Sequence, residues 1–353
     1  MNRARQQGEP VDEAERRRRV ASAVANVVRK QVDVGVDIVN DGELGRFNFL
    51  AYAPERLTGF EPDPSGRSDR LNRGDYQRFA DFYRELHGNR QPWIQAVCTG
   101  PIHYVGQQRL RADLDNLKAA LSGVQAQDAF VTAVSASSYG RGHNDYYRTE
   151  EEYLDALGQA LKEEYTAIVD AGFVLQIDDP GLPARWDSLS PSMSLEEYRR
   201  YASVGIEALN ATLQHLPADR IRYHICWGSW HGPHTTDIEL RDIVDVMLRV
   251  HAGTFSVEAG NVRHDMDWRV WQDVRLPAGK KLMPGVVSHA TNVVEHPDLV
   301  ADRLVRYAQL VGRDNVIAGT DCGLGNRVHP QIAWAKLEML AEGAARANRQ
   351  LRG

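Results

Sequence analysis

The segment TEEEYLDALGQALKEEYTAIVDAGFVLQIDDP, residues 149–180, contains one complete helix–strand unit. Thr149 and the three glutamates after it form a capping box, in which the Thr hydroxyl and a Glu carboxylate satisfy free amides at a helix start. Apolar residues at helical spacing follow, and Gly172 ends the predicted helix. The stripe consists of Leu154, Leu157, Leu161, Tyr165 and Ile168. Residues 173–177 are mostly apolar, which predicts a strand buried on both faces.

Seven similar apolar runs are further strand candidates, and amphipathic helices separate most of them. They cover residues 36–40, 93–98, 129–134, 221–225, 254–257, 281–287 and 315–318. Ser194 and Pro297 mark the starts of two more helices. Repeated strand–helix units predict an α/β fold, a (β/α)8 barrel of the TIM type, with a doubly wound open sheet as the alternative. Barrels carry their chemistry at the carboxyl ends of the strands.

The composition is that of an ordinary globular protein. The chain has 353 residues, 42% hydrophobic and 25% charged, which excludes a disordered chain. Its net charge of −6 argues against a nucleic-acid partner, and no apolar run approaches the roughly 18 residues of a membrane span. The polar start lacks a signal core, so we expect a cytoplasmic protein. The sequence does not indicate an oligomeric state.

Residue types that bind metals follow three of the predicted strands. His224 and Cys226 are two positions apart at one strand end, so their side chains share a face. Glu258 and Cys322 follow two later strands. Taken singly, each of these four residues could have a purely structural role; a buried Cys, for example, often packs as a small hydrophobic residue. Together, an imidazole, two thiolates and a carboxylate predict a tetrahedral zinc site. Cys98 lies inside a predicted strand and is interpreted as core.

These motifs resemble the zinc site of cobalamin-independent methionine synthase. The resemblance extends from about residue 20 to 345 and covers the catalytic half of that family only. It rests on His224-x-Cys226, Val257-Glu258, Asp321-Cys322-Gly323-Leu324, Val39-Asn40-Asp41-Gly42-Glu43 and Leu175-Gln176-Ile177-Asp178-Asp179-Pro180. A single-barrel branch that includes epoxyalkane:coenzyme M transferase is more similar still. That similarity rests on His224-Ile225-Cys226-Trp227-Gly228, Gly232-Pro233-His234, Glu258-Ala259-Gly260-Asn261 and Gly319-Thr320-Asp321-Cys322-Gly323.

The resemblance implies a zinc-dependent methyltransferase or alkyltransferase with one catalytic barrel domain over residues 1–353 and an excursion at about 60–105. It implies Zn²⁺ on His224, Cys226, Glu258 and Cys322, and no cobalamin. Zinc would keep a small thiol ionised, so that the thiolate attacks the carbon of an alkyl donor. Glu258 is the hardest donor of the four, and we expect it to yield its place to the incoming thiol.

Two carboxylates are candidates for binding the thiol substrate. Family members hold the amino group of homocysteine with two acidic side chains, and the matching positions are Glu43 and Asp178. Asp178 is also assigned a catalytic role. Each has a structural alternative: Glu43 could pair with Arg46, and Asp178, which comes before Pro180, could cap a turn.

A histidine near the predicted seventh barrel strand is the candidate proton donor. The family places this histidine in an Asp-Ile-His segment, and His289 lies close to that position but one residue out of register. His231 and His234, on the loop after the fifth strand, are rival candidates. Trp227 and Tyr146 complete the predicted substrate-binding residues.

The sequence departs from the family in three respects. It has no room for the second, N-terminal barrel. Between Ala129 and Glu150 there is no Trp to stack on a folate pterin, although Tyr139, Tyr146 and Tyr147 are aromatic. These two departures count against folate as the methyl donor. The sequence also begins at the helix after the family's first strand. Since the resemblance makes 93–104 a hairpin, seven barrel strands remain, and we expect an upstream native start or another segment in the gap.

Four functions remain open at this stage. The first is thiol methylation, and the second is the making or breaking of a β-hydroxythioether, as in the coenzyme M branch. An amino-acid acceptor needs carboxylates, whereas a sulfonate acceptor needs cations such as Arg46, Arg141 or Arg185. The third is a non-catalytic zinc-stabilised barrel. The fourth is a metal-free decarboxylase, because uroporphyrinogen decarboxylase has a similar barrel.

Overall fold

The computed structural model describes residues 10–46, 48, 52–63, 74–87, 96–139, 143–190, 192–228 and 230–352. Part of the expected excursion, the start of the predicted strand at 93–98 and Arg141 lie outside these described residues.

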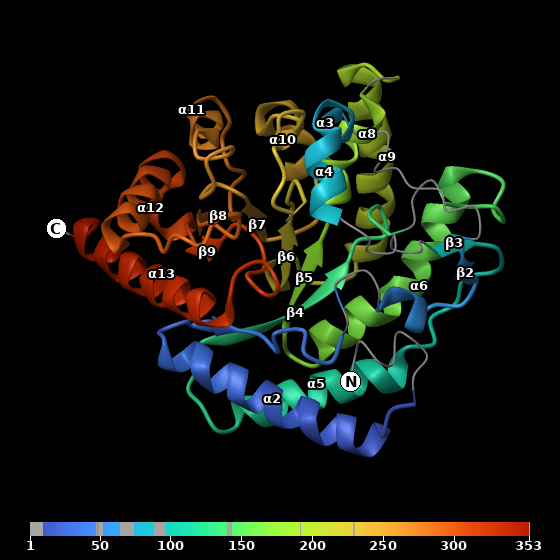
Figure 1. Ribbon diagram of the computed structural model, residues 1–353, viewed down its shortest axis with the longest axis horizontal. Helices are drawn as coiled ribbons and strands as arrows, with labels where there is room; N and C mark the ends of the chain where they lie inside the picture. Colours follow the sequence, from blue (N-terminus) through green and yellow to red (C-terminus); the bar gives the residue numbers. More distant parts are fainter. Residues whose placement is uncertain are drawn as a thin grey trace.

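A single parallel sheet of seven strands occupies the centre of the molecule (Figure 1). The strands are β1 (Ile38–Val39), β4 (Asp128–Val134), β5 (Val174–Asp178), β6 (Ile221–His224), β7 (Thr254–Val257), β8 (Lys281–Val287) and β9 (Gly319–Thr320). Their order in space is their order in the sequence, with helices in the connections. This is the topology of a TIM-type barrel, so the predicted α/β barrel is confirmed.

The helices pack around the outside of this sheet, α2 against α5, α6 against α9, and α12 against α13. The longer ones are α2 (Glu13–Asp33), α4 (Ala80–His87), α5 (Gln107–Leu121), α6 (Glu150–Asp170), α9 (Leu195–Leu213), α10 (Leu240–Leu248), α12 (Pro297–Val311) and α13 (Pro330–Gln350). The shorter ones are α3 (Gly74–Arg78), α7 (Gly181–Ala184), α8 (Trp186–Leu189) and α11 (Val270–Asp273). In the described part of the chain, no helix is both long and apolar enough to cross a membrane.

Local sequence signals account for where the main helices start. The Thr149 hydroxyl accepts the amide of Glu152 at the start of α6. Ser194 and Glu197 form a complete capping box at the start of α9, each side chain bonding the other's backbone amide. Pro297 occupies the first turn of α12, where its missing N–H costs nothing.

Two of the predicted strands differ from the structure. The strand predicted at 315–318 is wrong: β9 begins at Gly319, and a 3-10 turn, Arg313–Asn315, precedes it. Only an isolated bridge between Leu282 and Val316 occurs in the predicted range. The last residues of the run at 93–98 form β3 (Ala96–Cys98), which pairs antiparallel with β2 (Phe60–Pro62) outside the barrel, as expected for an excursion.

Helices α2 and α13 meet where the sheet has its two edges. β1 and β9 are the edge strands, and within the described residues they do not pair with each other. Lys30 of α2 lies 4.5 Å from the ring centroid of Trp334 of α13, within the range of a cation–π contact. The helical layer therefore continues across the gap in the sheet.

Strand register sorts the side chains into an outer apolar set and an inner polar set. Leu175, Ile177, Ile221, Tyr223, Phe255 and Val257 are completely buried. The residues between them are polar, and Asp178, His224 and Ser256 are direct register partners on β5, β6 and β7. Because side chains on a strand alternate between its faces, these three project into the barrel at one level.

A buried ion pair ties α13 to the loop that follows β8. The ammonium of Lys336, which has no exposed surface, donates to both carboxylate oxygens of Glu295 (2.9 and 3.0 Å) and to the carbonyl of Val293. Glu295 also accepts the amide of Ser288 at 2.9 Å. All donors of the ammonium are thus used, and the start of the loop is fixed.

The variant Lys336→Met should lower the free energy of unfolding by roughly 3–5 kcal/mol, because it leaves the Glu295 carboxylate buried without its cation. Urea unfolding followed by circular dichroism would measure the loss. Arg346→Met on the same helix is the matched control, since Arg346 pairs with Glu342 at the surface. Equal losses in the two variants would contradict the assignment.

Candidate metal centre and substrate site

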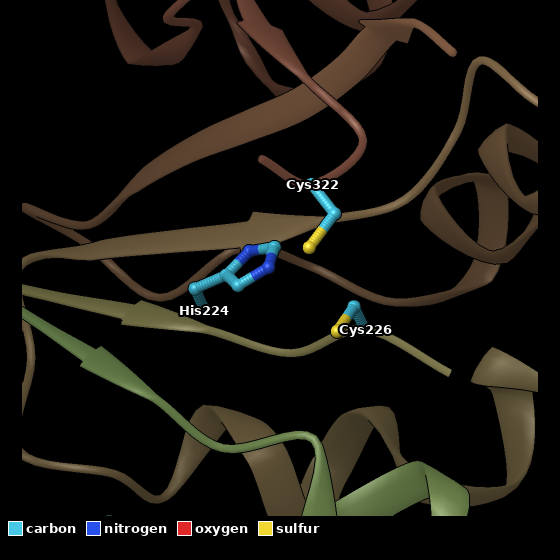
Figure 2. A group of neighbouring side chains, drawn as sticks. All are labelled: His224, Cys226 and Cys322. Atoms are coloured by element: carbon cyan, nitrogen blue, oxygen red, sulfur yellow. The ribbon is translucent and has the colours of Figure 1, made fainter. Parts of the chain in front are cut away.

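Three side chains converge at the carboxyl ends of β6 and β9. A ring nitrogen of His224 and the sulfurs of Cys226 and Cys322 all lie within 4.8 Å of one another. Figure 2 shows the imidazole and the two thiols pointing toward a common centre. His224 and Cys226 are buried, and Cys322 is half-buried. The i, i+2 spacing on β6 thus places both side chains on one face, and the last strand supplies the third.

Ser256 fixes the orientation of the His224 ring. Its Oγ lies 3.0 Å from Nδ1 of His224, on the neighbouring strand at the same register. When Nδ1 donates its proton to Ser256, Nε2 is the ring nitrogen left with a lone pair for a metal. Histidines that bind metals are usually oriented by such a bond at the other nitrogen. Ser256 was missed from sequence, although it lies two residues before Glu258 and so shares its face.

The two thiols have opposite protonation preferences. A hydrogen bond from Cys226 holds the pKa of Cys322 well below its usual range, and the neighbouring His224 lowers it further. The same bond, together with burial, raises the pKa of Cys226. A thiolate beside an imidazole and a second sulfur is a donor set that suits a soft divalent cation such as Zn²⁺.

Glu258 belongs to a second, adjacent group of side chains. Its carboxylate, an Asp321 carboxylate oxygen and a ring nitrogen of His289 lie within 4.8 Å of one another. Glu258 accepts the backbone amide of Trp227 (2.9 Å) and the side-chain amide of Asn261 (2.7 Å). Burial raises its pKa well above the usual value. The structure thus groups three of the four predicted metal ligands and places the fourth in the neighbouring group.

Asp321 and His264 support Glu258, and neither was assigned a role from sequence. Asp321 accepts the amides of Ala259 and Gly260 at 2.8 and 2.7 Å, which fixes the backbone after Glu258. It belongs to the motif that includes Cys322, and that motif was the available signal. Burial lowers the pKa of His264, but hydrogen bonds to two aspartates raise it to about 10, so this ring is a cation near Glu258.

Glycine at position 285 lets β8 approach this group closely. A Cβ at that position would lie 2.4 Å from the Cα of Asp321, closer than real atoms approach. Any larger residue would push Asp321 away from the backbone after β7. Glycine is therefore required at position 285, because β8 passes very close to Asp321, the residue that follows β9.

The predicted substrate carboxylates lie on the same side of the barrel as the thiols. Asp178 is the register partner of His224, and Gln176 donates to it at 2.8 Å. Burial raises the pKa of Asp178 to about 7, His224 lowers it, and the charges of Glu43 and Cys322 raise it. A carboxylate whose pKa is raised by a second carboxylate nearby is a natural partner for a cation such as an ammonium group.

Glu43 is held in an unusual backbone conformation. Its φ is 54°, in the left-handed region that few non-glycine residues adopt. Its carboxylate accepts the Thr132 hydroxyl at 2.5 Å, and its own amide donates to Asp41. Strained residues of this kind concentrate at functional sites. Arg46 donates to Thr132, so it shares a hydrogen-bonding partner with Glu43.

His289 is buried next to Cys322. Only 2% of His289 is exposed, and its Nδ1 has no hydrogen-bond partner among the described residues. Burial lowers its pKa to about 4, so the ring is neutral at pH 7. His231, a rival candidate, is 3.3 Å from the His289 carbonyl through its Nε2. The other rival, His234, is bonded to Asp237.

Two further predicted residues are located away from this centre. Trp227 has no exposed surface, donates through its indole N–H to the carbonyl of Ile238, and packs 4.0 Å from the ring of His264. Tyr146 is half-exposed with its ring against Tyr147. The structure does not bring either side chain into the metal-binding group.

Comparisons with known proteins agree with this geometry. The family described as "Cobalamin-independent synthase, Catalytic domain" matches residues 1–70 and 129–346. A methionine synthase of Saccharolobus solfataricus is 24% identical over 335 residues, which cover 94% of this chain and 85% of that protein. One from Sulfolobus acidocaldarius is 22% identical, with 94% and 82% covered.

Solved structures show the same fold. A B12-independent methionine synthase from Shewanella sp. W3-18-1, in complex with selenomethionine, superimposes with a TM-score of 0.69 at 21% identity and covers 94% of this chain and 89% of that one. A putative vitamin-B12-independent methionine synthase from Listeria monocytogenes has a TM-score of 0.66 at 20% identity, with 100% and 93% covered. This chain belongs to the family of cobalamin-independent synthase catalytic domains.

Proposed function

We propose that this protein is a zinc-dependent methyltransferase that methylates a small thiol, with homocysteine as the acceptor. The observation that carries the proposal is the convergence of His224, Cys226 and Cys322 at the carboxyl ends of barrel strands in a member of this family. One barrel domain with an excursion outside the sheet performs the reaction.

The donor set fits zinc by its chemistry. His224, Cys226 and Cys322 would hold the ion. Glu258, whose charge raises the pKa of Cys226, would be the fourth ligand. When bound, Zn²⁺ would favour the ionised form of the substrate thiol at neutral pH, where a free thiol is mostly protonated.

Glu43 and Asp178 bind the ammonium group of the acceptor in this proposal. Asp178 lies beside His224, and the charge of Glu43 raises the pKa of Asp178. A cation bound there would offset that charge and favour the ionised form of Asp178. A sulfonate acceptor would meet the same two carboxylates, and like charges repel. The geometry therefore favours an amino-acid thiol over coenzyme M.

His289 is the group placed to move the proton. In the overall reaction the thiol loses its proton, an S–CH3 bond forms, the bond between methyl and donor breaks, and the donor's leaving group gains a proton. The neutral ring of His289, buried beside Cys322, accepts the first proton and returns it to the leaving group. The methyl donor is not identified by any described residue.

Purified protein should contain about one zinc ion per chain, and Cys322→Ser should lose most of it, because a hydroxyl is a poor ligand for this metal. Elemental analysis after gel filtration would measure the content, and the thiolate absorption of the cobalt-substituted protein would report the ligands. Cys98→Ser is the matched control, since Cys98 lies in β3 and donates to the Gly100 carbonyl. Equal zinc in both variants would exclude the proposed centre.

Asp178→Asn should raise the KM for homocysteine by about 10- to 100-fold, the range expected when a hydrogen bond to a charged group is lost. The reaction of 2-mercaptoethanol, which has no amino group, should change much less, because Asp178 would contact only the amine. Steady-state kinetics with both thiols would measure the ratio. If both acceptors lost the same factor, or coenzyme M were the preferred acceptor, the assignment would be wrong.

A further inference from the structure

Part of the chain that the family match does not cover lies at the end of the barrel where the carboxyl ends of the strands are. The matched residues are 1–70 and 129–346, so α3 and α4 lie outside the match. We call these two helices, residues 74–87, the insert. The insert packs against α8, at the end of the barrel toward which the strands point (Figure 1).

The insert is bonded to the loop that follows β6. This loop, residues 230–237, is called the β6 loop and begins four positions after Cys226. Asp75, which is 1% exposed, accepts both the amide (3.0 Å) and the hydroxyl (2.5 Å) of Thr235. Asp187 of α8 accepts the hydroxyl of Thr236 and the amide of Gly74. Buried carboxylates thus join the insert, α8 and the β6 loop.

An aromatic contact forms the second attachment. Tyr83 of α4 is 3% exposed, and its hydroxyl accepts the indole N–H of Trp230 at 3.2 Å. Trp230 stacks on His234 with the ring centroids 4.5 Å apart. A Cβ at Gly228 would lie 1.7 Å from the Trp230 ring, so the backbone just after Cys226 is in direct contact with this side chain.

The β6 loop also contacts His289, the predicted proton-transfer residue. His231 lies 3.3 Å from the carbonyl of His289, so one short loop connects the insert to the loop after β8. His234 is fixed with φ at 53° and bonds to Asp237 and to the Trp230 carbonyl. The β6 loop is therefore bonded to the insert through Trp230 and Thr235, and to the loop after β8 through His231.

We propose that Asp75 and Tyr83 are positioning residues: through the β6 loop, the insert sets the placement of His289 and of the backbone after Cys226. The inference rests on the proposed function for its effect on turnover. The placement itself is a separate, structural claim. Because displacement of reacting groups by about 1 Å can lower turnover about 100-fold, the insert can act on the reaction without contacting the substrate.

Hydrogen exchange tests the structural claim without any substrate. In Asp75→Ala, the Thr235 amide and its neighbours in the β6 loop should exchange at least about tenfold faster than in the natural protein, because their acceptor is gone. Asp75→Asn, which keeps one acceptor oxygen, should give an intermediate rate. Asp81→Ala is the matched control, because Asp81 is exposed on α4 and pairs with Arg84.

Steady-state kinetics on the same proteins test the effect on turnover. Asp75→Ala and Tyr83→Phe should lower kcat by about 10- to 100-fold, with zinc content unchanged and the KM for the thiol within about threefold. Tyr83→Phe keeps the ring and removes one hydroxyl, so it remains informative if Asp75→Ala does not fold.

The two measurements separate the possible outcomes. Faster exchange in the β6 loop with lower kcat, both absent in Asp81→Ala, supports the proposal. Unchanged exchange overturns it, whatever the kinetics show. Faster exchange with unchanged kcat overturns the positioning role. If the natural protein transfers no methyl group to any thiol, the proposed function fails, and exchange alone still decides whether the insert holds the loop.

Discussion

The parallel register of β5, β6 and β7 is the constraint on which the site depends. It places Asp178, His224 and Ser256 at one level inside the barrel, so a carboxylate, an imidazole and a hydroxyl become neighbours without any loop to arrange them. A shift of one residue in any strand would turn its side chain toward the helices. The rigid sheet thus provides the precision that a metal centre and its substrate require.

Concentrating thiols and carboxylates in a buried space carries an electrostatic cost, which the surrounding groups reduce. Asn261 donates to both Glu258 and Asp321, and backbone amides after β7 donate to Asp321. The His264 imidazolium adds a positive charge close to Glu258. Burial still raises the pKa of Glu258 well above its usual value and that of Asp321 to about 6, and these partners oppose that rise.

The proposed site is built by the barrel strands, and one neighbouring segment lies outside the family match. The strands and their ends supply the proposed metal ligands and the proposed substrate carboxylates, and these lie within the residues that match the family. The insert lies outside that match and contacts the β6 loop through Asp75 and Tyr83. Segments at this end of a barrel vary more than the strands do, so changes in the insert could alter how the β6 loop is held while the strands keep the proposed site.

The sequence by itself determined the barrel, through the alternation of apolar runs and capped helices, and it identified the residue types at the strand ends. His224 and Cys226 were predictable as a pair, because a two-residue spacing on a strand fixes a common face. Only the tertiary structure decided that Glu258 lies with His289 and Asp321, that Ser256 orients His224, and that the insert holds the β6 loop. Those contacts join residues far apart in the chain, and their partners are set by strand register and loop packing, which local patterns do not encode.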